Sequence, residues 1–162
     1  MIEPNIIELN ALTLLGMSIR TSVSENKTFE LWSGFKPKAK HIQNKADGLF
    51  YSVQQYQKGL AMEEFSPTNV FQKWAAVAVT DSETVLPGLE TLHLEGGKYA
   101  VFIHKGPATA FYQTSQFIFG TWLPSSAYEL DDRAHFERFD KNYHPNDPLA
   151  EEEIWVPIKE KA

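Results

Sequence analysis

Short runs of apolar residues separated by turn residues dominate the chain and predict a domain rich in β-strands. Two such runs follow each other near the start, at residues 6–9 and 14–20, and we interpret them as one strand with a bulge. The other runs predict strands at residues 48–57, 71–81, 89–94, 99–104, 135–141 and 153–159. The pairs Pro87-Gly88 and Gly96-Gly97 mark turns between them.

One segment, residues 24–44, has apolar residues three and four positions apart, which is the spacing of one helix face. These residues are Phe29, Trp32, Phe35, Ala39 and Ile42. Ser24 is placed to cap the start of this helix. Pro37 opposes an unbroken helix, because an interior proline removes a backbone hydrogen bond and clashes with the preceding turn. We therefore predict a kink or break at residues 34–38.

A second helix is predicted at residues 107–121. Its apolar side carries Phe111, Ser115, Ile118 and Trp122, and Pro107 suits the first turn. We expect Pro124 to end it. The order strand, helix, strand, strand then occurs twice, in residues 5–81 and 88–159, which is a repeat of topology and not of close sequence identity.

This order predicts a single α+β domain over residues 1–162. Two strand-helix-strand-strand units would form a curved antiparallel sheet with both helices on one face and a cleft at the pseudo-twofold. A cleft at a repeat interface suits a small ligand.

Composition supports a packed domain and narrows its chemistry. The 162 residues are 43% hydrophobic and contain no cysteine, which excludes disulfides, thiolate metal sites and thiol nucleophiles. The net charge of -6 argues against a nucleic-acid surface, and residues 129–162 carry ten acids against five bases. Aromatic residues make up 13% of the chain, and aromatic rings combined with acids suit a cation.

Targeting and cofactor motifs are missing from the sequence. There is no apolar run of membrane-spanning length, and residues 1–10 have no basic leader, so we expect a cytoplasmic protein without membrane contacts. The five histidines lack metal-ligand spacing, and the chain has no phosphate loop, dinucleotide fingerprint or Gly-x-Ser-x-Gly elbow. We expect no metal and no cofactor.

Several motifs in the second half occur in the order of a known family. They are GKYAVF (97–102), KGP (105–107), WLPSSAYE (122–129), FERF (136–139) and EIWVPIK (153–159). With them the chain resembles the gyrase-inhibitor-like (GyrI-like) effector-binding domains. That family includes drug-sensing domains of AraC-type and MerR-type regulators and free-standing versions, some carried on integron cassettes. The first half fits more loosely, at Leu31-Trp32 and Tyr51-Ser52-Val53.

The resemblance implies a duplicated fold with a ligand cleft and an acidic residue buried among aromatic rings. The carboxylate of the family's Phe-Glu-x-Tyr motif falls on Glu137, and drug-sensing members bind lipophilic organic cations there. Two positions depart from the family pattern, because Phe139 stands where tyrosine is usual and Ala127 where glycine is usual. The loss of the tyrosine hydroxyl weakens any role that needs it for proton transfer.

Alternation along a strand places Glu137 on one face with His135 and Phe139, and Glu153 with Trp155 on the neighbouring strand. We expect these acids and rings to converge on the ligand. The full set of candidate ligand-binding residues is Glu137, Trp32, Tyr51, Tyr112, Trp122, Phe139, Glu153 and Trp155. In the alternative interpretation Glu137 and Glu153 are solvated acids, and the tryptophans belong to the core.

The leading functional hypothesis is a non-enzymatic domain that binds lipophilic, cationic, drug-like compounds and acts as a stand-alone sensor, a transcriptional co-regulator or a scavenger. One alternative is a hydrolase of reactive cyclopropane-bearing compounds, in which Glu137 handles the proton and Tyr51 assists. Another is a protein-interaction role, either binding gyrase or serving a separate DNA-binding regulator.

Overall fold

A computed structural model describes residues 3–59, 64–83 and 86–162, so Met1 and Ile2 of the segment inspected for a leader lie outside the described residues. The strands are β1 (Asn5–Leu9), β2 (Leu12–Thr21), β3 (Lys45–Gln55), β4 (Phe71–Val79), β5 (Glu90–Leu94), β6 (Gly97–Lys105), β7 (Tyr128–Leu130), β8 (His135–Phe139) and β9 (Glu151–Glu160). The helical segments are α1 (Thr28–Ala39), η2 (Ala108–Ala110), α2 (Phe111–Phe117), η3 (Ile118–Trp122) and α3 (Leu123–Ser125).

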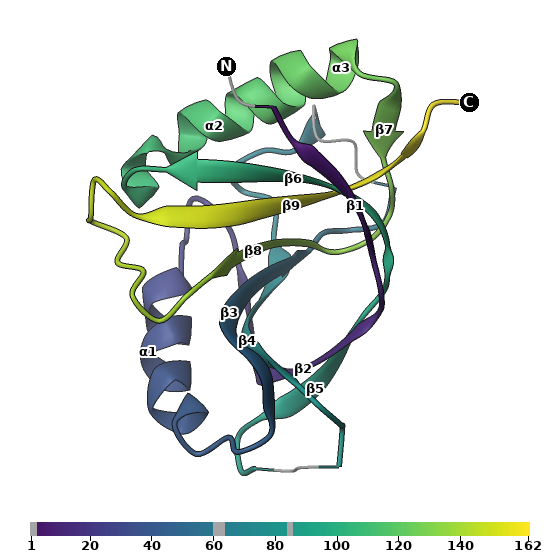
Figure 1. Ribbon diagram of the computed structural model, residues 1–162. Coiled ribbons are helices and arrows are strands. Elements are labelled where there is room, and N and C mark those ends of the chain that lie inside the picture. The colour runs from purple at the N-terminus through teal and green to yellow at the C-terminus, as the bar shows by residue number, and fades with distance from the viewer. Residues whose placement is uncertain (1–2, 60–63, 84–85) are drawn as a thin grey trace.

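All strand pairs are antiparallel, in the order β1-β6-β9-β8-β3-β4-β2-β5, with β7 added to β9. The sheet curls strongly (Figure 1). β1 pairs with β6 and the following strand β2 pairs with β5, so the two consecutive strands lie at opposite ends of the strand order. The predicted single strand with a bulge is thus two strands, and the chain bends between them. Gly96 lies against this bend: a β-carbon there would come within 2.6 Å of the Leu9 carbonyl oxygen. The close approach requires glycine.

Both helices lie on the outer face of the curl, which confirms the predicted α+β architecture. Leu31, Phe35 and Ala39 of α1 pack on the outer side of β2 and β4. Ile118, which begins η3 directly after α2, packs on Phe102 and its neighbours in β6 and β9. The two helices therefore cover opposite ends of the sheet and leave β8 between them (Figure 1).

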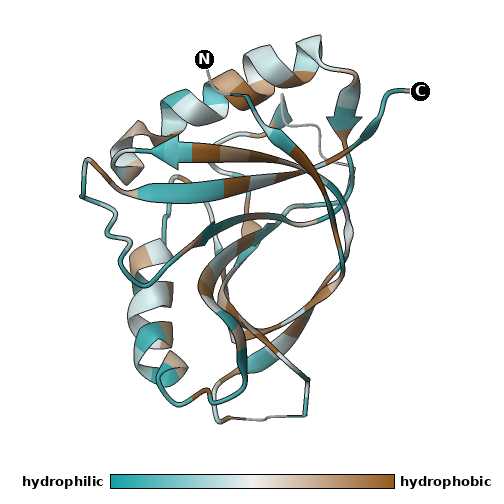
Figure 2. Ribbon diagram, in the orientation of Figure 1, coloured by the Kyte–Doolittle hydropathy of each residue, from teal (hydrophilic) through white to brown (hydrophobic). Residues whose placement is uncertain are grey.

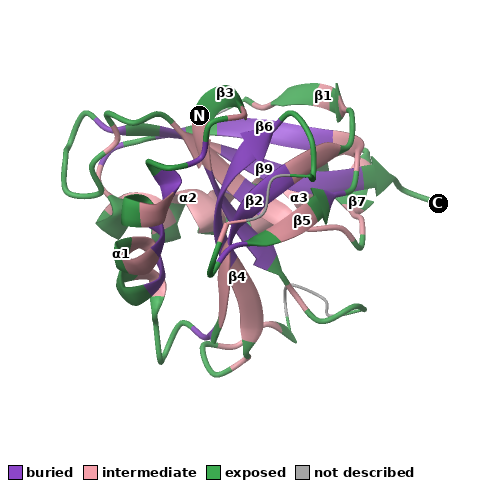
Figure 3. Cartoon of the chain, turned by 90° about the horizontal axis from the view of Figure 1, so that it is seen from below, coloured by how far each residue is buried: buried purple, intermediate pink, exposed green. Residues whose placement is uncertain are grey.

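The inner face of the curl holds a second, ring-rich core. Its largest buried residues come from five strands and are Tyr51, Trp74, Tyr99, Phe136 and Trp155. Apolar residues follow the middle of the strands (Figure 2), and the buried stretches run along β6 and β9 while the loops stay exposed (Figure 3). Successive side chains of a strand therefore enter different cores, because both faces of the sheet are covered.

The first helix differs from its prediction at both ends. It begins at Thr28, because the side chains of Thr21 and Ser22 accept backbone N–H bonds within residues 22–27 and hold this segment as a loop. Ser24 therefore caps no helix. The helix also continues through Pro37, so the predicted break is wrong. Proline lies in the last turn, where Phe35 and Ala39 on the buried side keep the backbone helical.

The second helix is longer and less regular than predicted. It begins as the 3₁₀ turn η2, becomes α2, and widens into the π-helical segment η3 before α3. Pro124, the predicted end, does not stop the helical segment, which continues to Ser125. Pro124 lies in the first turn of α3, where a missing backbone N–H costs little. The short strand β7 was not predicted. Within the described residues, no helix has the length and apolarity to cross a membrane.

Candidate functional site

Glu137 lies on the outer face of the sheet, between the two helices. It is directly opposite Ile154 of β9 on one side and Ser52 of β3 on the other. Ile154 belongs to the core under α2, and Ala75, opposite Ser52, belongs to the core under α1. Directly paired residues share a face of the sheet. Glu137 is therefore the acidic residue in the line Ala75, Ser52, Glu137, Ile154 across four strands, and the two ends of that line lie in the cores under the helices.

The Glu137 carboxyl is held by one neighbour and poorly solvated. Gln54 Nε2 donates a hydrogen bond of 3.0 Å to Glu137 Oε1 across the β3–β8 pair. Burial raises the pKa of Glu137 to about 7, and the nearby Lys73 ammonium and the Gln54 bond only partly oppose this shift. The carboxyl therefore lacks enough partners to offset its lost hydration.

Lys73 of β4 reaches into the same region. It is directly opposite Gln54, and its Nζ donates a hydrogen bond of 3.1 Å to Thr28 Oγ1 at the start of α1. Burial lowers the pKa of Lys73, while Glu137 and Glu152 oppose this shift. A positive charge thus faces the carboxyls from across β3.

A second carboxyl, Glu152 of β9, completes the group. It lies two residues before Ile154 on the same face, and only 8% of the residue is exposed. Burial, and then repulsion from Glu137, raise the pKa of Glu152 to about 8, and contact with the Tyr143 hydroxyl opposes this shift. We refer to Gln54, Lys73, Glu137 and Glu152 as the Glu137 cluster.

Aromatic rings flank this cluster on one side. Phe139, two residues along β8 from Glu137, lies 5.4 Å from Trp32 of α1 and 5.9 Å from Phe50 of β3, measured between ring centroids. Tyr143 lies closer still to Phe139, at 4.6 Å. We call Trp32, Phe50, Phe139 and Tyr143 the Phe139 ring cluster.

A second group of rings lies on the other side of Glu137. His135, two residues before Glu137, lies edge-on to Tyr56 with ring centroids 5.0 Å apart. Phe65 and Phe71 pack on Tyr56 at 5.5 and 5.1 Å, and the four rings form the Tyr56 ring cluster. Burial lowers the pKa of His135 to about 4, so its imidazole is neutral near pH 7. An acid therefore lies between two sets of neutral rings.

The expected convergence of Glu153 with Glu137 is wrong. Glu153 is directly opposite Arg138, one residue along from Glu137, so its side chain lies on the inner face. Arg138 Nε lies 2.6 Å from Glu153 Oε1, and the guanidinium carbon lies 4.9 Å from the centre of the Trp155 ring. An arginine of the chain itself already fills this acid-and-ring cage.

Tyr51 belongs to that inner cage as well. It is directly opposite Arg138, and its hydroxyl donates a 2.6 Å hydrogen bond to Asp47 Oδ2. Burial is the main cause that raises the pKa of Tyr51 to about 12. Since Tyr51 and Glu137 are on opposite faces of the sheet, the geometry does not support a shared proton-transfer role for them.

The remaining candidates lie along the second helix. Trp122 packs edge-on against Phe102 of β6, with ring centroids 5.2 Å apart, in the core under α2. Tyr112 is 69% exposed, and its hydroxyl accepts a hydrogen bond from Gln116. Neither residue contacts the Phe139 or the Tyr56 ring cluster in any interaction within the described part of the chain.

Sequence reasoning missed several members of the site. Lys73 interrupts the apolar run of β4, and the alternation of that run would have placed it on the outer face with Ala75. Glu152 was missed because β9 begins at Glu151 and not at Glu153 as predicted. Tyr56 and Tyr143 follow the ends of their strands, where alternation gives no direction.

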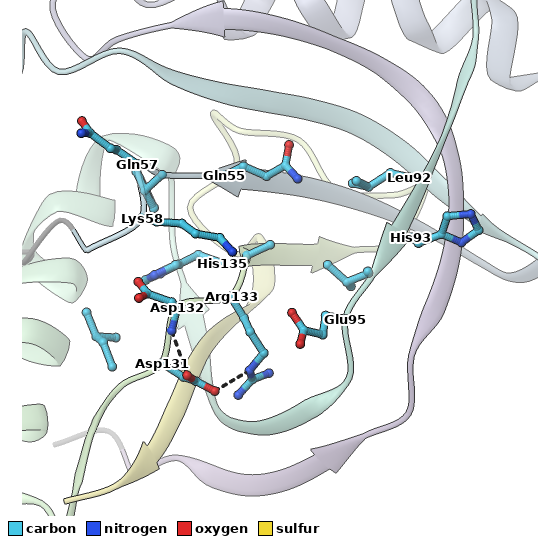
Figure 4. A pocket seen from close by; sticks show the side chains of 14 residues that line it. Gln55, Gln57, Lys58, Leu92, His93, Glu95, Asp131, Asp132, Arg133 and His135 are labelled. Atoms are coloured by element: carbon cyan, nitrogen blue, oxygen red, sulfur yellow. Dashed lines mark hydrogen bonds and ion pairs between the residues drawn. The ribbon is translucent and has the colours of Figure 1, made fainter.

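A cavity of about 210 Å³ opens at the mouth of the curl (Figure 4). Its charged lining includes Lys58, Glu95 and the paired Asp131 and Arg133, whose Oδ2 and Nε atoms are 2.8 Å apart. Glu137, Trp32 and Phe139 do not line it, but Tyr56 and His135 of the Tyr56 ring cluster do. We assign the candidate site to the Glu137 cluster, because a poorly solvated carboxyl lies between two ring clusters there.

Among residues 3–59, 64–83 and 86–162, no group of three His, Asp or Glu side chains is placed to hold a metal ion. The chemistry that the Glu137 cluster supports is the binding of charged organic groups, or proton exchange at neutral pH.

Comparison with known proteins finds relatives of this chain and similar folds. The transcriptional regulator BrlR of Pseudomonas aeruginosa is 27% identical over 154 residues, which are 94% of this chain and 54% of BrlR. The chain therefore spans about half the length of this curated relative. The structure of SAV2435 bound to tetraphenylphosphonium has a TM-score of 0.73 at 17% identity, over 97% of this chain and 94% of that one.

A further solved structure has a similar fold. The integron cassette protein VCH_CASS2 of Vibrio cholerae has a TM-score of 0.65 at 18% identity, over 97% of this chain and 96% of that one. At these identities the two solved structures show the fold alone. The family described as the GyrI-like small molecule binding domain matches residues 2–159. The chain therefore belongs to the GyrI-like small-molecule-binding domains.

Proposed function

We propose that this protein binds lipophilic organic cations over Glu137, between α1 and α2, without chemical conversion of the ligand. The observation that carries the proposal is a carboxyl with a raised pKa set between two ring clusters. Such a carboxyl either holds a proton or binds a cation that replaces its lost hydration. A permanent organic cation with apolar substituents satisfies the charge and the rings together.

The Phe139 ring cluster supplies the walls on one side. Trp32 and Phe139 pack on each other near the acid, and each ring over a cation contributes about 0.5 to 2 kcal/mol. The rings contact one another, so a ligand enters by parting them. Binding of this kind depends on the charge and the width of the ligand more than on its detailed shape, so it favours a range of drug-like cations.

Two comparisons support the class of ligand and the role. SAV2435 was solved with tetraphenylphosphonium, a lipophilic cation, and BrlR is a transcriptional regulator that matches this chain over about half of its length. We propose that the domain senses such cations for a DNA-binding regulator, in which case binding over Glu137 is its signal. A scavenger would bind the same ligands and need no such partner.

Two probes of the same shape and opposite charge test the proposal. Tetraphenylphosphonium and tetraphenylborate are compared in thermal-shift titrations of the full chain, since a ligand that binds only the folded state raises its melting temperature. We expect stabilisation by the cation and none by the anion. Equal stabilisation by both, or by neither, would contradict a charge-selecting site.

A further inference from the structure

Lys73 is the cationic member of the Glu137 cluster. A site that binds only the positive charge of a ligand does not need a lysine beside its carboxyls. Its ammonium is oriented from the α1 side. Thr28 Oγ1 donates its own hydrogen to Asn26 Oδ1 at 2.6 Å, which leaves the oxygen to accept the 3.1 Å bond from Lys73 Nζ. An ammonium carries three donors, so this contact uses one of them.

The ammonium and the two carboxyls face one region without closing into ion pairs. Lys73 is directly opposite Gln54, whose amide contacts Glu137, so the ammonium lies on the same outer face as both acids. Within the described part of the chain, however, the ion pairs are formed by other residues. Opposite charges that lie near each other without contact are the partners that a ligand group with both charges would join.

We propose that Lys73 makes this site selective for amphoteric ligands, organic cations that also carry a carboxylate or similar anionic oxygen. The cationic centre lies over Glu137 and the rings, and the anionic oxygen accepts hydrogen bonds from Lys73. This inference rests on the proposed function, because it assigns the cationic end of the ligand to the same acid.

The physical reason is the cost of leaving Lys73 beside a plain cation. Two positive groups in a poorly solvated region repel each other, and the desolvated N–H donors of the lysine lack acceptors. A carboxylate on the ligand removes both costs, because charge-assisted bonds to an ammonium are about twice as strong as neutral ones. Lys73 therefore weakens binding of plain cations and strengthens binding of amphoteric ones.

Rhodamine B and its ethyl ester are a matched pair of probes. They share one xanthylium cation, but only rhodamine B carries a free carboxylate. Their dissociation constants are measured by fluorescence anisotropy at about pH 8.5, where acids with the pKa values of the cluster are largely ionised. The proteins are wild type, Lys73→Met, Lys36→Met and Glu137→Gln. Lys36 is the control, because it lies on α1 near the Phe50 ring but is exposed.

We expect wild type to bind rhodamine B more tightly than the ester. In Lys73→Met the preference for rhodamine B over the ester should fall by at least about tenfold, while Lys36→Met keeps it. An unchanged preference in Lys73→Met, with an ester affinity that still depends on Glu137, would overturn the role of Lys73 and leave the proposed function standing. Failure of both dyes to bind, or an ester affinity unchanged in Glu137→Gln, would overturn both. A ratio of two affinities in one variant is insensitive to partial loss of folded protein.

Discussion

Arg138 Nε lies 2.6 Å from Glu153 Oε1 on the inner face of the sheet, one residue away from Glu137 on the outer face. The guanidinium of Arg138 therefore occupies the position beside Glu153 and Trp155 where the sequence analysis expected the cation of a ligand. Adjacent residues on β8 thus differ in role: Arg138 packs in the inner core, whereas Glu137 is in none of the ion pairs of the described residues.

The first prediction concerns this inner pair. Glu153→Gln should lower the free energy of unfolding by about 1 to 2 kcal/mol, because it leaves a half-buried guanidinium without its anion while partial exposure screens the loss. Urea denaturation measures the effect. Lys105→Gln, which breaks the exposed pair with Glu151, is the control and should cause no measurable change. Equal effects of the two substitutions would contradict the structural role of Arg138 and Glu153.

A second prediction follows from the raised pKa of Glu137, about 7 against an ordinary value of 4.5. Below about pH 4.5 the carboxyl is protonated in both the folded and the unfolded chain, so Glu137→Gln should match wild type. Between about pH 4.5 and pH 7 the unfolded chain releases this proton while the folded chain still holds it, so wild type loses stability as the pH rises to the folded pKa. Glu137→Gln should then be the more stable protein by about 2 to 3 kcal/mol at pH 8.

Urea denaturation at a series of pH values measures that difference. The difference reports Glu137 together with its repulsion of Glu152, because Glu137→Gln also removes that repulsion, and both effects favour the variant at pH 8. A variant less stable than wild type at pH 8 would show that the carboxylate is well paired and not poised for a ligand.

The third prediction tests the ring wall. Trp32→Leu should weaken tetraphenylphosphonium binding by about three- to thirtyfold, because it removes the ring that packs on Phe139 and would face the cation. Tyr112→Leu is the control, since that ring is exposed on α2 and should leave the affinity unchanged. Calorimetric titration measures both. A larger effect of Tyr112→Leu would move the ligand to the outer surface of α2.

The fourth prediction tests the curl of the sheet. Gly96→Ala should lower the free energy of unfolding by about 2 kcal/mol or more, because the new methyl group meets the backbone between β1 and β2. Gly120→Ala is the matched control. Its β-carbon meets no atom within 4 Å, so alanine should stabilise that helical turn by about 0.5 to 1 kcal/mol. Chemical denaturation that finds the same sign for both variants would contradict the close approach at Gly96.

Much of the fold could be predicted from local periodicity. Alternation located most of the strands, because that signal comes from single segments. The helical spacing located only part of the buried side of α1: Phe35 and Ala39 are buried as expected, but Phe29 is 86% exposed and the buried Leu31 was not in the predicted set. The same alternation placed Glu137 on one face with His135 and Phe139. These are the positions at which the acid meets the two ring clusters.

Pairing between distant strands could not be predicted in this way. The register of β8 on β9 decides that Glu152, and not Glu153, shares a face with Glu137, and a shift of one residue reverses every side chain. Lys73 could not be assigned to the site from the sequence either. It is far from Glu137 along the chain, and the two strands that carry these residues are neighbours of β3 on its two sides. Segments such as residues 22–27 form loops through side-chain bonds that compete with helix caps.

The most direct test of the central claim is the dissociation constant of tetraphenylphosphonium for wild type, Glu137→Gln and Glu153→Gln, measured by calorimetric titration at about pH 8, where an acid with a pKa near 7 is ionised. Loss of a buried counter-ion should weaken binding by about thirtyfold or more in Glu137→Gln, while Glu153→Gln binds as wild type does. Equal affinities for wild type and Glu137→Gln would contradict the assignment of Glu137 as the counter-ion of the bound cation.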